Sequence, residues 1–441
     1  MRKNSILAIA LSLALVVMMF AGCGSKASPP ASEPPANPPA PPAATTPAPE
    51  PAPDEDEGGG GYVQGVTDTE ILIADSVPIS GNFAQTGIPT VAGLEAYIKM
   101  VNEGGGIDGR KIKYLHQDDE ADPVKGKAYL QGYINDDKVF AIVEHFGTAV
   151  VSATIDDLHE SGIPTVYFGT GIGQLYSEGA TTNAEGRNTF PVQPIYKTEG
   201  QVMVARGAGN FNATKIGIVY TGDDAGKDML AGAEKKCTEL GIEFKSEQVA
   251  AAAPDVSAAV TSIKEFGPDF IIVAAIQATM PTIVKEIAKQ GIKVPAITSY
   301  VNVSPAMSEL VAPDINGLFD LYGSGWMDFS TEQRGQNLEE YNKWIDQQYL
   351  GNSYAMCGWI AGFFFTEGLR RLEGKEVTWD SFIAAMESAP IDIPFGGTVD
   401  YSGGKRLGTP ALCMFKVDPA DTSGLLWSRV EPLQSIDEIL S

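Results

Sequence analysis

Residues 70–117 read EILIADSVPISGNFAQTGIPTVAGLEAYIKMVNEGGGIDGRKIKYLHQ, and their pattern indicates the fold class. Residues 70–77 have the composition of a strand, and residues 87–103 carry apolar side chains near helical spacing. Residues 111–117 alternate as a further strand does. Three glycines at 104–106 end the helix, and Asp108-Gly109 makes the turn that follows. This stretch therefore predicts a strand–helix–strand unit of a parallel sheet.

The same alternation continues along the chain, with a loop-rich interruption at residues 181–194. It predicts strands at 139–143, 164–168, 215–220, 243–249, 270–275 and 296–300, and helices at 124–136, 148–161, 227–240, 255–266 and 280–290. Two long helices, 331–349 and 355–372, precede a predicted hairpin of strands 398–401 and 411–417 around Ser402-Gly403-Gly404. Such an order indicates an α/β fold with doubly wound parallel sheets.

The interruption divides the folded part into two lobes connected near Pro191. We expect residues 63–191 to form the first lobe, completed by about 323–390, and residues 192–322 to form the second, completed by about 391–435. In parallel sheets ligands bind beyond the carboxyl ends of the strands, so loops that follow strands are the first places to search for a site.

The N-terminal residues resemble an export signal. Arg2 and Lys3 precede an uncharged run, residues 6–20, of about 15 residues, which suits a signal peptide better than a membrane span of about 20. Phe20-Ala21-Gly22-Cys23 resembles a bacterial lipobox, although that pattern prefers leucine in place of Phe20. Residues 1–23 are therefore predicted to be a lipoprotein signal peptide, with Cys23 lipidated; an ordinary signal peptide with a chance cysteine is the alternative.

Residues 24–62 form a proline-rich stretch that offers little apolar surface to bury. Proline-rich chains extend by about 3.1 Å per residue, so this stretch can span on the order of 100 Å. We interpret it as a disordered linker that holds the folded part away from a membrane. A recognition segment for proline-binding modules is the alternative.

Composition excludes several classes of function. The net charge of −25 disfavours nucleic acid as a partner. Cys237, Cys357 and Cys413 show no zinc-ligand spacing and read as small buried residues, although a disulfide among them stays possible. The three histidines, His116, His145 and His159, form no HExxH motif, and no GxSxG motif is present. We therefore expect no catalytic residues, no metal and no cofactor.

Four motifs occur in order along the first part of the chain: Pro78-Ile79-Ser80-Gly81, residues 101–111, residues 118–123 and Gly162-Ile163-Pro164. In this order and at this spacing they resemble the amino-acid-type solute-binding proteins of bacterial ABC importers, of which the leucine/isoleucine/valine-binding protein is nearest in type. The resemblance covers about residues 66–417. It implies a type I periplasmic binding fold, two lobes joined by a hinge of several strands, and capture of a small molecule in the cleft between them.

The resemblance also implies where the ligand is held. In the first lobe it selects Ser80 and Thr86 in one loop, Thr148 at a helix start as the hydroxyl that binds a ligand carboxylate, and Gly169, Thr170 and Gly171 in a glycine-rich loop. Ser80, Thr86 and Thr148 are equally explained as helix N-caps. The loop at 168–173 lacks the spacing of a nucleotide-binding loop.

In the second lobe and at its border the resemblance selects Asp224, Gln277, Tyr300 and Trp326. Asp224 has a helix cap as its alternative role, and Trp326 has core packing. Where amino-acid binders carry an aromatic residue and an acid for the ammonium group, this chain has Ala225 and Tyr300. One hypothesis is therefore a ligand that lacks an α-ammonium group, unless Asp224 supplies the missing charge.

The function implied is that of a lipid-anchored, extracytoplasmic binding subunit for ABC permease subunits. The ligand would be a small carboxylate or an amino-acid-like molecule, captured by hinge closure. A sensor component that feeds a signalling receptor would use the same fold and pocket and stays open as an alternative. A secreted hydrolase is the third class, and the absent catalytic motifs count against it.

Overall fold

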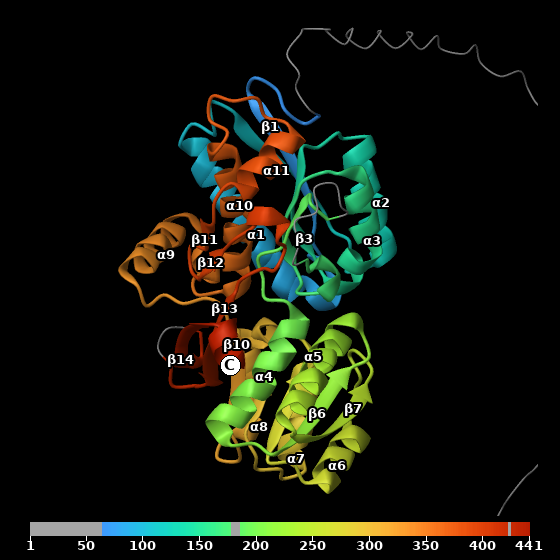
Figure 1. The fold of residues 1–441 in the computed structure, drawn as a ribbon. Coiled ribbons are helices and arrows are strands. Elements are labelled where there is room, and N and C mark those ends of the chain that lie inside the picture. The colour runs from blue at the N-terminus through green and yellow to red at the C-terminus, as the bar shows by residue number, and fades with distance from the viewer. Residues whose placement is uncertain (1–63, 178–185, 422–424) are drawn as a thin grey trace, which may run out of the picture. The chain divides into compact units, whose positions relative to one another are not determined.

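Parallel strand pairing organises the part of the chain that the computed structural model describes, residues 64–177, 186–421 and 425–441. Figure 1 shows two α/β lobes. The expected signal peptide, Cys23 and the proline-rich linker lie outside the described residues.

The first lobe contains a parallel sheet with the strand order β2-β1-β3-β4-β5. Its strands are β1 Glu70–Ser76, β2 Lys111–Gln117, β3 Ala141–Phe146, β4 Thr165–Gly169 and β5 Thr189–Phe190. The helices of this lobe are α1 Ala84–Glu103, α2 Pro123–Asn135, α3 Thr148–Ser161, α10 Ser353–Arg370 and α11 Trp379–Glu387. Helices α1 and α10 pack together on one face of the sheet, and α2 and α3 cover the other (Figure 1).

The second lobe is built on the sheet β14-β13-β10-β9-β8-β6-β7, in which only β13 and β14 run antiparallel to their neighbours. Its strands are β6 Lys215–Thr221, β7 Glu243–Val249, β8 Phe270–Ala274, β9 Ala296–Thr298, β10 Leu321–Gly325, β13 Ala411–Val417 and β14 Trp427–Ser435. Its helices are α4 Tyr196–Phe211, α5 Asp224–Leu240, α6 Ser257–Phe266, α7 Thr279–Lys289, α8 Pro305–Ile315 and α12 Ile436–Leu440.

Shorter elements complete the described chain. They are α9 Glu332–Trp344, the strand pair β11 Ile391–Asp392 and β12 Thr398–Val399, and the 3-10 turns η1 Gly81–Phe83, η2 Gly173–Leu175, η3 Tyr300–Asn302, η4 Gln347–Tyr349 and η5 Ser402–Gly404.

The predicted α/β class with parallel sheets is confirmed, and the helix at 148–161 and the strands at 111–117 and 243–249 match to the residue. The predicted hairpin of residues 398–401 with 411–417 is wrong. Strand β12 pairs with β11, whereas β13 lies between β10 and β14 in the second sheet. An isolated hairpin is marginally stable, and insertion into the sheet buries Leu412 and Cys413 completely.

The chain passes between the lobes at residues 191–195, 326–331 and 405–410, which we call the crossing segments (Figure 1). Hydrogen bonds join them to each other and to the short strand pair. Thr409 N donates to Val192 O at 2.8 Å, Asp328 N to Phe395 O at 2.6 Å, and Tyr401 Oη to Pro191 O at 2.8 Å. Since these bonds lie at the border of the lobes, the segments can act as one hinge.

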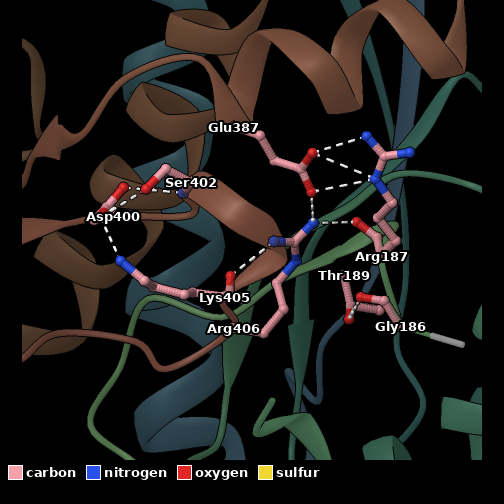
Figure 2. A network of polar contacts seen from close by, with 8 residues as sticks. All are labelled: Gly186, Arg187, Thr189, Glu387, Asp400, Ser402, Lys405 and Arg406. Atoms are coloured by element: carbon pink, nitrogen blue, oxygen red, sulfur yellow. Dashed lines mark hydrogen bonds and ion pairs between the residues drawn. The ribbon is translucent and has the colours of Figure 1, made fainter. Parts of the chain in front are cut away.

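A buried arginine anchors the last crossing segment to the first lobe. The side chain of Arg406 is fully enclosed, lies 4.5 Å from the ring centroid of Phe190, and pairs with Glu387 at 2.7 Å (Figure 2). Arg187 pairs with the other oxygen of Glu387 at 2.9 Å, and Arg406 also donates to the carbonyl of Arg187. Burial acts to raise the pKa of Glu387, but hydrogen bonds and charge from both arginines outweigh it and hold that pKa below its usual value.

Replacing Glu387 should therefore destabilise the hinge. Glu387→Ala leaves Arg406 buried without its counter-charge, so the free energy of unfolding in urea should fall by about 3–5 kcal/mol. Because the folded-state pKa of Glu387 is depressed, its contribution is present above the usual glutamate pKa and is lost as the pH falls through the folded-state value.

Lys405→Ala is the matched control. Lys405 is the adjacent residue, and it pairs at 2.9 Å with Asp400 on the partly exposed surface (Figure 2). Its loss should change stability by only about 0–1 kcal/mol. Equal losses for the two variants would contradict the assigned role of the buried pair.

Candidate functional site

A cavity of about 810 Å³ lies where the carboxyl ends of strands from both sheets meet the crossing segments. Phe146 and Gly169 close strands of the first lobe, Gly325 closes a strand of the second, and Ile276 follows another. Parallel strands place all their carboxyl ends at one edge of a sheet, and the two edges here face the same space. The cavity is therefore lined from both lobes.

One end of the cavity is built by the start of helix α3. Gly147 precedes this helix with φ 93°, a left-handed conformation that favours glycine, and no side chain caps the first turn. The first N–H groups of a helix favour anions, because they have no intrahelical partners and stand at the positive end of the helix dipole. Thr148 adds a hydroxyl at the same place, and its Oγ1 lies 2.8 Å from Thr170 Oγ1. This end can hold a carboxylate.

A chain of hydrogen bonds crosses the cavity wall from one lobe to the other. Tyr300 Oη of the second lobe donates to Gln193 Oε1 at 3.1 Å, and Gln193 Nε2 donates to Tyr167 Oη of the first lobe at 2.8 Å. Tyr196 stacks on Tyr300 with ring centroids 5.9 Å apart. Burial raises the pKa of Tyr300 well above its usual value, so its hydroxyl stays protonated.

Glu144, on strand β3, is the acidic residue of the polar end. It lines the cavity, its side chain is fully buried, and neither carboxyl oxygen has a hydrogen-bond partner among the described residues. Burial raises its pKa well above the usual value, and the charge of Asp75 raises it further. The sequence analysis did not select this residue; the usable signal was an acidic side chain inside a buried strand.

His145 itself is not part of the cavity lining. Its Nε2 lies 2.7 Å from Thr154 Oγ1, and burial lowers its pKa to about 4, so the ring is neutral near neutral pH. It packs in the first lobe as a buried polar residue.

The rest of the cavity wall is mainly apolar and aromatic, with some polar side chains such as Asn342, Ser353 and Arg429. Its side chains come from η3 and the residue after it, from the crossing segment at 326–331, from α9 and α10, and from β13 and β14. They include Val301, Val303, Trp326, Met327, Phe329, Leu338, Met356, Phe415 and Trp427. A ligand with an apolar body would bury that body here.

The predicted site residues divide into two groups. Thr148, Gly169, Gln277, Tyr300 and Trp326 all line the cavity, although they lie far apart in the sequence. A Cβ atom at Gly169 would lie 2.4 Å from the ring of Phe146, so only glycine fits there without a shift.

The other predicted residues lie outside the cavity lining. Thr86 donates to the carbonyl of Phe83 at 2.7 Å, within the start of α1, and Ser80 hydrogen-bonds to Asp118. Thr170 is buried behind Thr148. Gly171 O accepts a bond from Tyr196 N at 2.8 Å.

Asp224 also lies outside the lining, on the surface where the lobes meet. Its Oδ2 accepts a bond from Ser152 Oγ of α3 at 3.1 Å, and Ala225 is buried behind it. The hypothesis of a ligand without an ammonium group assumed that no acid other than Asp224 reaches the cleft. Glu144 lines the cavity, so that assumption does not hold.

The cysteines and the potential metal ligands of the described ranges form no further site. Cys237, Cys357 and Cys413 are buried and free of disulfides, and no group of three or more histidine, cysteine, aspartate or glutamate side chains is placed to hold a metal ion. No helix in these ranges combines the length and the hydropathy that crossing a membrane requires.

Comparison with known proteins identifies the family. A family profile described as "Periplasmic binding protein" matches residues 70–422, most of the chain. The chain therefore belongs to the periplasmic binding protein family, and it is a solute-binding protein rather than an enzyme, similar to Leu/Ile/Val-binding protein homologues. Membership of this family implies that it acts outside the cytoplasm.

Individual relatives agree with the fold and with the class. The "Leu/Ile/Val-binding protein homolog 2" of Brucella abortus is 26% identical over 333 residues, which cover 75% of this chain and 86% of that protein. A fatty acid ABC transporter substrate-binding protein from Thermomonospora curvata superposes with TM-score 0.71 at 21% identity, covering 85% of this chain and 94% of the other. A branched chain amino acid ABC transporter protein from Thermus thermophilus with bound valine gives TM-score 0.72 at 15% identity, covering 84% and 97%.

Thr148 should contribute directly to ligand affinity. Thr148→Val removes the hydroxyl at the start of α3, and loss of a hydrogen bond to a charged group costs about 1.5–3 kcal/mol. The dissociation constant of a carboxylate ligand should therefore rise about tenfold or more, as measured by isothermal titration.

Thr170→Val is the matched control, because it deletes the same Thr148–Thr170 hydrogen bond from a residue that does not line the cavity. Affinity should stay close to that of the wild type in this variant. If both variants bind as the wild type does, or weaken binding equally, Thr148 does not contact the ligand.

Proposed function

We propose that this protein is the extracytoplasmic solute-binding subunit of an ABC importer, and that it captures a small carboxylate or amino-acid-like ligand by closing its lobes. The observation that carries the proposal is the cavity itself. It lies between the lobes, next to the crossing segments, with an uncapped helix start at one end and apolar walls at the other.

Closure follows from contacts that one ligand makes with both lobes. A ligand that touches α3 and Tyr300 together is bound best when the lobes are close, so it shifts the population toward the closed state. At the rim, Gly173 N of the first lobe donates to Asp228 Oδ2 of the second at 2.6 Å, and Ser152 bonds to Asp224. These contacts would form and break with closure, and permease subunits would bind the closed form.

The dimensions of the cavity favour a ligand with a substantial apolar body. Pockets of about 300–1,000 Å³ hold drug-sized ligands, and about 810 Å³ lies in the upper part of that range. The two structural relatives named above are described with a fatty acid and with valine, which are carboxylates with apolar bodies of different length. A carboxylate at α3 with its body against Trp326 and Trp427 would use both ends of the cavity.

The ligand class can be tested by mass spectrometry and thermal shift. The molecule that co-purifies with the protein should be a carboxylate, and a panel of leucine, valine, phenylalanine, isocaproate, hydrocinnamate and octanoate should contain at least one stabilising member. Ligand at about 100 times its dissociation constant adds roughly 2.7 kcal/mol, enough to raise the melting temperature by several degrees. A co-purified ligand without a carboxylate, together with no stabilisation by the panel, would overturn this class.

We also propose that Cys23 is lipidated and anchors the protein to a membrane, with residues 24–62 as the tether. The sequence Phe20-Ala21-Gly22-Cys23 after the apolar run supports this. Cys23→Ser should move the protein from the membrane fraction to the soluble fraction of the cells without changing ligand affinity. Continued fractionation with membranes would show that another feature holds the protein there.

A further inference from the structure

The carboxyl group of Glu144 is unusual among the buried acids of the first lobe. Asp75 is equally buried, but its two oxygens are bonded to Tyr114 and, at 2.7 Å, to His116 Nδ1. Glu144 has no such partner among the described residues and lines the cavity instead. A buried polar group without a partner lowers stability, so its position calls for a role outside the folding of the lobe.

The backbone that carries Glu144 is also strained. Glu144 has φ 68°, and Tyr167, at the same level of the neighbouring strand, has φ 67°. Left-handed backbone is unfavourable for both residue types, and inside a strand such strain is a feature that binding sites can retain. Gly169 gives Glu144 its space, because a Cβ atom there would lie 3.0 Å from Glu144 Oε1.

The titratable groups around Glu144 are acidic or neutral. Asp75 faces it from β1, Tyr167 from β4 and Cys357 from α10. The charge of Asp75 acts to raise the pKa of Glu144, and the charge of Glu144 acts to raise the pKa values of Tyr167 and Cys357. None of them can supply a positive charge. The cation that lines the cavity, Arg429 of β14, is already paired with Asp328. Among the described residues that line the cavity, no positively charged side chain is therefore free to compensate a negative charge on Glu144, and a positive group of the ligand would do so.

We propose that Glu144 binds an ammonium group of the ligand and releases its own proton to solvent when it does so. This inference rests on the proposed function, because it places the ammonium group in the same cavity whose other polar element, the start of α3, receives the carboxylate. The ligand nitrogen keeps its protons, and the Glu144 carboxylic acid becomes a carboxylate. Amino-acid binders carry an aromatic residue and an acid for the ammonium group where this chain has Ala225 and Tyr300. Glu144, an acid of the first lobe, takes the role of that acid.

The proposal predicts proton-linked binding with a defined sign. Burial and Asp75 raise the pKa of Glu144 in the empty protein, and a bound cation lowers it. Between the two pKa values, binding of an aminated ligand releases up to one proton, and its affinity rises with pH by up to about tenfold per unit. A ligand without the amine shows no such rise.

The test compares three probes that share one apolar body: leucine, its deaminated analogue isocaproate and its decarboxylated analogue isoamylamine. Titration calorimetry in two buffers of different ionisation enthalpy, at mildly acidic pH, counts the protons released. The wild type should bind leucine more tightly than isocaproate, and it should release protons with the two amine-bearing probes, leucine and isoamylamine, but not with isocaproate. Glu144→Gln should weaken leucine binding by about tenfold to a hundredfold, abolish the proton release and leave isocaproate binding unchanged or stronger.

Stability of the empty protein gives a readout that needs no ligand. Glu144→Gln should leave the melting temperature unchanged or raise it, because the wild-type group has no partner to lose. Asp75→Asn, the matched buried acid outside the cavity lining, should lower the melting temperature and keep the preference for leucine. A marked loss of stability in Glu144→Gln would show that the residue is structural and overturn the proposal.

The outcomes separate this inference from the proposed function. If isocaproate binds as tightly as leucine, or if the co-purified ligand is a carboxylate without a basic nitrogen, the carboxylate class stands and the role of Glu144 is wrong. If no probe binds and the co-purified molecule is not a carboxylate, the proposed function fails. The role of Glu144 then stands if that molecule carries a basic nitrogen, and it is wrong if the molecule carries none.

Discussion

Parallel strands bring all their carboxyl ends to one edge of a sheet, and in this protein two such edges face one cavity. That constraint explains why residues separated by more than a hundred positions, such as Thr148 and Tyr300, line the same space. It also explains the chemistry, because each strand in such a fold is followed by the start of a helix or a turn with unpaired N–H groups. The polar end of the cavity follows from the topology, and the side chains at the crossing segments supply the apolar end.

Charge is distributed differently in the hinge and in the cavity. Arg406 is buried with Glu387 as its partner, so this pair fixes the geometry of the crossing segment. Glu144 is buried in strained backbone at the cavity lining, and its carboxyl group has no hydrogen-bond partner among the described residues. Both oxygens of the Glu387 carboxyl group are paired with arginines, whereas both oxygens of Glu144 lack a hydrogen-bond partner among the described residues and lie at the cavity. This contrast is what a binding protein needs if the ligand is to complete the structure and favour closure.

Much of the fold could be predicted because periodicity and turn residues are local signals. The strand at 111–117 and the helix at 148–161 show this. The order of strands could not be read in the same way: β13 joins β10 and β14 rather than β12, a choice made by packing between distant segments. Thr148, Gly169, Gln277, Tyr300 and Trp326 were found through the loops that follow strands and through family resemblance. Glu144 was not found in this way, because it lies in left-handed backbone inside a strand, a conformation that no sequence pattern predicts.

A crystal structure of the protein with the ligand that co-purifies with it would test the central claim most directly. The account predicts ligand density in the cavity between the lobes, with a carboxylate at the first N–H groups and hydroxyl of α3 and a nitrogen within hydrogen-bond distance of Glu144. Density at another place, or a ligand in the cavity that offers no polar atom to either Thr148 or Glu144, would contradict it.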